Sequence, residues 1–244
     1  MIEFKGVRKQ YNHGVTALDD VNLKIEKGEF VFIEGPSGSG KSTFLKLLIK
    51  EEDVTNGQII VAEQEVNKLK DKEIPFFRRK IGFVFQDFRL LYDRTVYDNI
   101  SFALHVIGTS DKEIARQVPL VTKLVGLEGK EGFFPNQLSG GEQQRVALAR
   151  AIVTNPPIII ADEPTGNLDS ETARGIMEIL YEVNKKGATV IVVSHDSNLI
   201  KASGKRVISM KRGKIVNDTG SFTASNNMYS AVNNTVNNTM GGIM

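Results

Sequence analysis

The fold is decided by Gly35-Pro36-Ser37-Gly38-Ser39-Gly40-Lys41-Ser42, which fits the pattern G-x-x-x-x-G-K-[S/T] at every fixed position. Glycines let the backbone curl until consecutive amide N–H groups face one centre, where a helix N-terminus adds positive potential. Residues 29–34 are apolar on both faces, which predicts a buried strand, and residues 41–49 predict a helix. Strand, loop and helix in this order predict a phosphate-binding βαβ unit.

Further strands are predicted on both sides of this unit. Residues 2–7 and 17–25 alternate apolar with polar side chains, as half-buried strands do, whereas residues 158–161 and 189–193 are apolar throughout. We therefore expect an α/β fold with a mostly parallel core sheet and an N-terminal antiparallel β subdomain. Residues from about 90 to 145 lack a strand-like run, and Ile114, Val118, Val121 and Val125 recur at helical spacing, so a helical subdomain is expected there.

Composition narrows the class of protein. The 244 residues carry a net charge of +2 and no cysteine, so disulfides, thiolate zinc sites and a nucleic-acid partner are not expected. No stretch approaches the roughly 20 apolar residues that span a bilayer, and the N-terminus lacks a signal-peptide pattern. If the protein works at a membrane, we expect another chain to hold it there. Residues 217–244 contain seven asparagines and are expected to form a disordered tail after a domain of residues 1–216.

The phosphate-binding loop predicts the first half of a catalytic site. Lys41 should reach the β- and γ-phosphates of ATP, Ser42 should coordinate Mg²⁺, and Thr43 should contact the α-phosphate side. Asp162 and Glu163 follow the apolar strand at 158–161, where Asp162 would hold the Mg²⁺ shell and Glu163 would polarise the attacking water. A strand that ends in two solvated acids is the simpler alternative, which the loop makes improbable.

A second anion site is predicted within residues 138–145, Leu-Ser-Gly-Gly-Glu-Gln-Gln-Arg. Ser139, Gly140 and Gly141 leave amide N–H groups exposed at the N-terminus of the helix that follows. One nucleotide has one γ-phosphate, whereas the chain has two predicted anion sites. A head-to-tail dimer explains both, if the phosphate-binding loop of one copy and the Ser139 loop of the other close around each ATP. A serine that merely caps a helix is the alternative.

Together these motifs resemble the ATP-binding cassette (ABC) ATPases over about residues 1–216. The resemblance implies four further roles, at Gln86, His195, Asp169 and Tyr11. Gln86 matches the glutamine that senses Mg²⁺ and the γ-phosphate, and His195 matches the switch histidine. Asp169, in Asn167-Leu168-Asp169, matches the residue that communicates across the dimer. Tyr11 matches the aromatic side chain that stacks on adenine.

Other stretches indicate a branch of the family. Residues 73–79, 85–99 and 134–137 are similar to the branch that acts in cell division, most specifically at Asp93-Arg94-Thr95-Val96. Branches for lipoprotein release or macrolide export tend to carry Leu-Pro-Thr-Leu-Thr-Val there. This segment would face the membrane partner, next to an apolar patch of Phe88, Leu90, Leu91 and Tyr92, for which core packing is the alternative.

The resemblance implies a homodimer at the cytoplasmic face of the membrane, docked on a permease-like protein at the division site. ATP binding would close the dimer and hydrolysis would open it, and the motion would control peptidoglycan hydrolases outside. An ATPase of a lipoprotein or macrolide exporter is the alternative within the class. A soluble ABC clamp on ribosomes or DNA is disfavoured, because such proteins usually have two cassettes, a coiled coil or a basic insertion.

Overall fold

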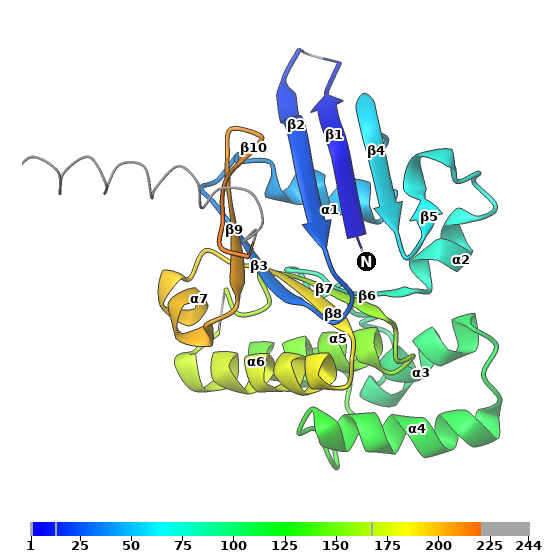
Figure 1. The fold of residues 1–244 in the computed structure, drawn as a ribbon. Coiled ribbons are helices and arrows are strands. Elements are labelled where there is room, and N and C mark those ends of the chain that lie inside the picture. The colour runs from blue at the N-terminus through cyan, green and yellow to red at the C-terminus, as the bar shows by residue number, and fades with distance from the viewer. Residues whose placement is uncertain (1, 13, 167, 221–244) are drawn as a thin grey trace, which may run out of the picture.

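The structure is a computed structural model that describes residues 2–12, 14–166 and 168–220. It contains two sheets with helices between and below them (Figure 1). The smaller sheet has the order β2-β1-β4-β5 and is antiparallel throughout. Its strands are β1 (Ile2–Gln10), β2 (Thr16–Ile25), β4 (Asn56–Val61) and β5 (Gln64–Glu65).

The larger sheet forms the core, with the order β10-β9-β3-β8-β7-β6. Its strands are β3 (Phe30–Glu34), β6 (Ile81–Val84), β7 (Ile158–Asp162), β8 (Thr189–Val193), β9 (Arg206–Lys211) and β10 (Lys214–Asp218). All neighbours pair in parallel except β9 and β10. The expected mostly parallel core with an N-terminal antiparallel sheet is therefore confirmed.

The parallel register brings three loops to one edge of the core sheet. Val193 at the end of β8 pairs with Ile33 of β3 on one side and with Asp162 of β7 on the other. The carboxyl ends of these strands therefore lie side by side, and the loops that follow them meet. In open α/β sheets, ligands bind in the crevice outside this edge.

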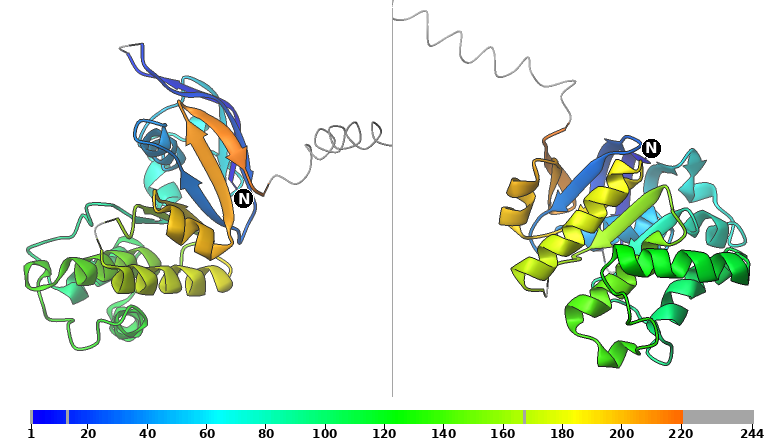
Figure 2. Two further views of the ribbon diagram at one scale, coloured as in Figure 1. Left: turned by 90° about the vertical axis from the view of Figure 1, so that its left-hand side faces the viewer. Right: turned by 90° about the horizontal axis from the view of Figure 1, so that it is seen from below.

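Helix α1 (Lys41–Leu48) lies between the two sheets (Figures 1 and 2). Its buried residues Phe44, Leu45, Leu47 and Leu48 share a hydrophobic core with strands of both sheets. The rings of Phe44 and Phe4 stack with their centroids 4.4 Å apart. The helix that follows the phosphate-binding loop is therefore clamped on two sides.

The opposite face of the core sheet is covered by helices, which share a second hydrophobic core with Phe30 and Phe32 of β3. These helices are α3 (Val96–Val106), α4 (Asp111–Leu124), α5 (Gly140–Ile152), α6 (Ser170–Lys185) and α7 (Ser197–Ser203), and a short helix α2 (Ile74–Arg78) precedes β6. Residues 90–145 contain α3, α4, the single turn η2 (Pro135–Gln137) and the start of α5. In Figure 2, α3 and α4 form a lobe beside α5.

The expected start of the tail at residue 217 is wrong by a few residues. Asn217 and Asp218 belong to β10, and Arg206 at the start of β9 binds the Asp218 carboxylate with N–O distances of 2.9 and 2.7 Å. Arg206 also binds Glu29, and this second ion pair connects β9 to the turn before β3. Residues 217–220 therefore belong to the folded domain, and residues 221–244 of the expected tail lie outside the described residues. In the part of the chain that is described, no helix is long and apolar enough to cross a membrane.

Candidate nucleotide-binding site

The loop between β3 and α1 is a cradle that requires glycine at both ends. Gly35 has a φ of +149°, and a Cβ atom there would lie 2.2 Å from the carbonyl oxygen of Met210. Gly40, with a φ of +106°, precedes the first turn of α1, and its Cβ would lie 2.6 Å from the carbonyl oxygen of Ala17. Any side chain at either position would push the loop away from its supports, which explains the two glycines of the motif.

This cradle forms the floor of a cavity of about 750 Å³ at the sheet edge. The residues that line it are Val15, Thr16, Ala17, Gly35, Pro36, Ser37, Gly38, Ser39, Gly40, Lys41, Ser42, Thr43, Gln86, Asp162, Glu163 and His195. The structure thus brings together every residue of the predicted loop with the predicted glutamine, the two acids and the histidine. Val15, Thr16 and Ala17 are additions that we did not predict; their only signal is that they follow Tyr11 in the first hairpin.

Lys41 stabilises the loop by binding backbone carbonyls at its start. Its ammonium group donates hydrogen bonds to the carbonyl oxygens of Gly35 at 2.7 Å and Pro36 at 3.1 Å. Ser39 is 2% exposed, and its hydroxyl finds no hydrogen-bond partner among the described residues. A buried polar atom without a partner costs free energy, so this one in the cavity lining points to a polar ligand.

Glu163 and His195 form a close pair at the carboxyl ends of β7 and β8. His195 Nδ1 lies 2.6 Å from Glu163 Oε2, so the imidazole donates to the carboxylate. Glu163 has a φ of +48°, and its amide donates to the carbonyl of Val193 at 2.9 Å. A left-handed backbone at a non-glycine residue is strained, and here it turns the carboxylate from the strand into the cavity.

Three oxygen-bearing side chains of the cavity, including Asp162, are suitable ligands for Mg²⁺. The Ser42 hydroxyl, the Gln86 amide and the Asp162 carboxylate line the same cavity, and Mg²⁺ prefers such ligands. Burial raises the pKa of Asp162, the negative charge of Glu163 raises it further, and Lys41 acts in the opposite direction. Within the described residues no group of three His, Asp or Glu side chains could hold a metal by itself, so phosphate oxygens and water would complete the shell.

A substitution of Asp162 should affect the stability of the nucleotide-free protein and the binding of Mg-ATP in opposite directions. Its pKa is raised in the folded protein, so stability falls as the pH rises from the unfolded pKa through the folded one. We therefore expect Asp162→Asn to raise the melting temperature of the nucleotide-free protein at neutral pH, while Mg-ATP raises that temperature less than in the parent. Thermal unfolding with and without Mg-ATP measures both, with the exposed Asp93→Asn as control. A lower melting temperature for nucleotide-free Asp162→Asn would contradict this account.

The structure places the other predicted residues outside this cavity. Tyr11 lies beside it, with its hydroxyl 3.3 Å from Thr43 Oγ1. Asp169 caps α6 by accepting from the amides of Glu171 and Thr172, and these hydrogen bonds lower its pKa. Ser139, Gly140 and Gly141 are absent from the described residues that line the cavity.

The Ser139 loop is held at the N-terminus of α5 by a capping box. Ser139 caps α5, and Glu142 accepts hydrogen bonds from the Ser139 amide and hydroxyl, each at 2.8 Å. Lys130 pairs with the same carboxylate, and these contacts lower the pKa of Glu142 to about 2. The amides at the N-terminus of α5 are thus presented at the end of a firmly capped helix.

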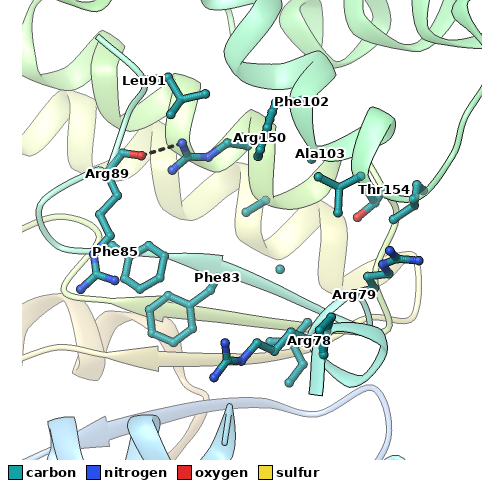
Figure 3. Close-up of a pocket in the computed structure, with 16 residues that line it drawn as sticks. Arg78, Arg79, Phe83, Phe85, Arg89, Leu91, Phe102, Ala103, Arg150 and Thr154 are labelled. Atoms are coloured by element: carbon teal, nitrogen blue, oxygen red, sulfur yellow. Dashed lines mark hydrogen bonds between the residues drawn. The ribbon is translucent and has the colours of Figure 1, made fainter. Parts of the chain in front are cut away.

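A second cavity, here called the arginine groove, lies between α2, β6, α3 and α5 and measures about 570 Å³ (Figure 3). Its apolar lining includes Phe83, Phe85, Leu91 and Phe102, and four arginines surround it: Arg78, Arg79, Arg89 and Arg150. Arg150 donates to the carbonyls of Phe88 at 2.8 Å and Arg89 at 2.7 Å, the latter drawn in Figure 3. Phe88 and Arg89 both have positive φ, so Arg150 supports a strained turn two residues after Gln86.

The predicted apolar patch is divided by the structure. Leu90 is 6% exposed in the core and Phe88 packs against that core, so core packing is the right explanation for these two. Leu91 lines the arginine groove, whereas Tyr92 is exposed. Of the adjacent segment, Thr95 caps α3 and Val96 is buried, while Asp93 and Arg94 are exposed. A role of Asp93 and Arg94 in partner contact stays a prediction.

The cradle, the paired acids and the capped Ser139 loop define an ATP-binding cassette. In agreement, residues 18–166 match the family described as ABC transporter. The chain belongs to this family. Among solved structures, the ATP-binding cassette MJ0796 in a dimeric post-hydrolysis state bound to ADP and Pi matches with a TM-score of 0.83 and 43% identity, over 89% of this chain and 97% of that one.

Within the family, the chain groups with the cell division ATP-binding proteins FtsE. It is 52% identical to FtsE of Mycobacterium tuberculosis, over 89% of this chain and 95% of the relative. Identity to FtsE of Bacillus subtilis is 51%, with 89% and 96% covered. For FtsE of Escherichia coli K12 the identity is 45%, with 88% and 97% covered. The chain is therefore an ATP-binding ABC subunit of the cell-division type, as the stretches around residues 93–96 predict.

Proposed function

We propose that the chain hydrolyses ATP as a head-to-tail homodimer in which each site combines two copies. This proposal rests on the observation that the two predicted phosphate-binding regions lie apart in one chain. The cradle, acids and histidine line one cavity, while the capped amides of Ser139, Gly140 and Gly141 lie outside it. The MJ0796 cassette is dimeric, and one of its dimeric structures is a post-hydrolysis state bound to ADP and Pi, which supports a dimer here.

Each residue of the cavity has a role in this reaction. Lys41 leaves the carbonyls of Gly35 and Pro36 and neutralises the β- and γ-phosphates. Ser42, Gln86 and Asp162 hold Mg²⁺, which supplies charge stabilisation to the phosphates when bound. Glu163 takes the proton of the attacking water, and His195 holds its carboxylate in place through Nδ1. Thr43 and Tyr11 bind the α-phosphate side and the adenine.

The dimer is closed by the second copy. Ser139 and the glycines after it bind the γ-phosphate across the interface, so closure requires ATP and hydrolysis releases it. Asp169 caps α6 at the end of the loop that follows the catalytic Glu163, and we assign it communication between the two sites because it matches the family's residue of that role. A shift of that loop on hydrolysis would therefore move the start of α6.

The partner in this proposal is the membrane protein FtsX, of which two copies bind one dimer. FtsE relatives support the cell-division role, and ATP-driven closure would be passed through FtsX to peptidoglycan hydrolases or their activators. The protein would then work at the cytoplasmic face of the cell membrane, at the division site. The arginine groove has the chemistry of a docking surface, because exposed apolar side chains lie beside cations that can pair with acidic groups.

A substitution in the arginine groove tests the proposed partner. Phe102 lines it and is 51% exposed, so Phe102→Glu should leave the fold and ATP affinity intact while it removes an apolar anchor. We expect at least about tenfold less FtsX to co-purify, as for loss of an interface anchor. The matched control is Leu120→Glu on α4, where Leu120 is 60% exposed and lies away from the groove.

The outcome is decided by mass spectrometry of the purified membrane complex. Recovery of FtsX with the parent and Leu120→Glu, but not with Phe102→Glu, is the expected result. Recovery of a lipoprotein or macrolide exporter permease with the parent protein would overturn the cell-division function. Equal recovery of FtsX with Phe102→Glu would place the docking surface elsewhere.

A further inference from the structure

Tyr11 is held by contacts both beside the ATP cavity, at Glu52 and Lys9, and on its lining, at Thr43. Its hydroxyl donates to Glu52 Oε1 at 3.1 Å and lies 3.3 Å from Thr43 Oγ1. Lys9 Nζ binds the same Glu52 carboxylate at 2.8 Å and stands 5.0 Å from the centre of the Tyr11 ring. Glu52 thus accepts from both the cation and the phenol, and these contacts with Lys9 and Tyr11 lower its pKa.

This cluster is shielded more than a surface ion pair. The Lys9 side chain is 14% exposed and that of Glu52 is 22% exposed. Lys9 also donates to the carbonyl of Asp53 at 2.7 Å, so its ammonium group has partners on two sides besides the ring. Partial burial reduces screening by water, so the geometry of such a pair is better defined than that of an exposed one.

The loop that carries Glu52 is anchored at both ends. At its start, Arg78 donates to the carbonyls of Ile49 at 3.0 Å and Lys50 at 2.9 Å, beyond the end of α1. At its end, Thr55 exchanges hydrogen bonds with Gln10, the residue before Tyr11. The fold therefore holds the Glu52 carboxylate at a fixed place relative to the Tyr11 backbone.

We propose that Lys9 and Glu52 are positioning residues for the nucleotide base: they fix the Tyr11 ring with the Lys9 ammonium over one face, so that adenine would stack on the other face. The inference rests on the proposed role of Tyr11 in the nucleotide site. Tyr11 is also tied to Thr43 of the phosphate-binding helix, so the base platform and the phosphate cradle share one hydrogen-bonded network. A ring fixed before ATP arrives loses less conformational entropy on binding.

The test compares base recognition with phosphate recognition. We expect Glu52→Gln to raise the KM for ATP about fivefold with kcat unchanged, because the neutral amide binds Lys9 and the Tyr11 hydroxyl more weakly than the carboxylate does. Affinity for tripolyphosphate, which has no base, should stay at the parent value. The control Glu51→Gln changes the neighbouring exposed carboxylate and should alter neither quantity. In a double-mutant cycle, Tyr11→Phe should add little to Glu52→Ala, since each removes the hydrogen bond between Tyr11 and Glu52.

Each outcome bears on the proposal. An unchanged KM in Glu52→Gln overturns it, and so does a parallel loss of tripolyphosphate affinity, which would mean that Glu52 supports the cradle as a whole. Tyr11→Ala separates this inference from the proposed site. If Tyr11→Ala leaves ATP affinity unchanged, the adenine role of Tyr11 itself is wrong. If Tyr11→Ala weakens ATP while Glu52→Gln does not, only the positioning role is wrong.

Discussion

Lys41→Ala is expected to weaken ATP binding by about 100-fold or more. The ammonium group would make charge-assisted hydrogen bonds to two phosphates, worth about 1.5–3 kcal/mol each, and about 1.4 kcal/mol corresponds to a factor of ten. The nucleotide-free protein offsets part of this gain, because Lys41 must first leave the carbonyls of Gly35 and Pro36. Titration calorimetry with a slowly hydrolysed ATP analogue measures the loss directly.

The control for this titration is Lys27→Ala, which removes one positive charge from an exposed turn between β2 and β3. Lys27→Ala and Lys41→Ala have the same net charge, so the long-range attraction between the protein and ATP changes by a similar amount in both. Circular dichroism and the melting temperature show whether each variant is folded. A folded Lys41→Ala protein with parental ATP affinity would reject the assignment of the cradle.

Glu163→Gln is expected to bind ATP like the parent while its turnover falls by about 10²- to 10⁴-fold, the usual contribution of a general base. The amide keeps the size of the carboxylate and can still accept a hydrogen bond from His195 Nδ1, so the site keeps its shape. A carboxamide cannot take the proton of the attacking water. Single-turnover phosphate release measures the chemical step, and ATP titration measures binding.

The matched control is Glu171→Gln, in the first turn of α6, an exposed acid outside the cavity. It should hydrolyse ATP at the parental rate. Parental turnover in Glu163→Gln would assign the proton transfer to another group. His195→Ala adds a second check, because loss of the 2.6 Å contact should slow turnover without abolishing ATP binding.

Local patterns were sufficient to predict the core of the site. Apolar runs mark β7 and β8, and the residue types that follow each run mark the two acids and the histidine that line the cavity. The phosphate-binding loop can also be predicted from local sequence alone, because the motif places glycine at the positions where the backbone needs a positive φ. These features depend on residues within about ten positions of one another.

Features built from distant segments were not predictable in the same way. Strand β10 reads Lys-Ile-Val-Asn-Asp, too polar to indicate a strand, and it is fixed by pairing with β9 and by the Arg206–Asp218 contact. The arginine groove combines α2, β6, α3 and α5, which no local pattern brings together, and of the expected apolar patch only Leu91 lines it. The contact of Glu52 with Tyr11 spans 41 positions and has no local signal.

In the proposed dimer, two copies enclose each ATP, and Ser139 of the second copy closes the site. The measurement that tests this arrangement most directly is the mass of Glu163→Gln by light scattering at saturating Mg-ATP, with and without Ser139→Arg. We expect twice the 27.0 kDa of the chain for Glu163→Gln and a single-chain mass for the double variant, with ATP still bound to both. A single-chain mass for Glu163→Gln, or a dimer that Ser139→Arg leaves intact, would rule out a site closed by Ser139 of a second copy.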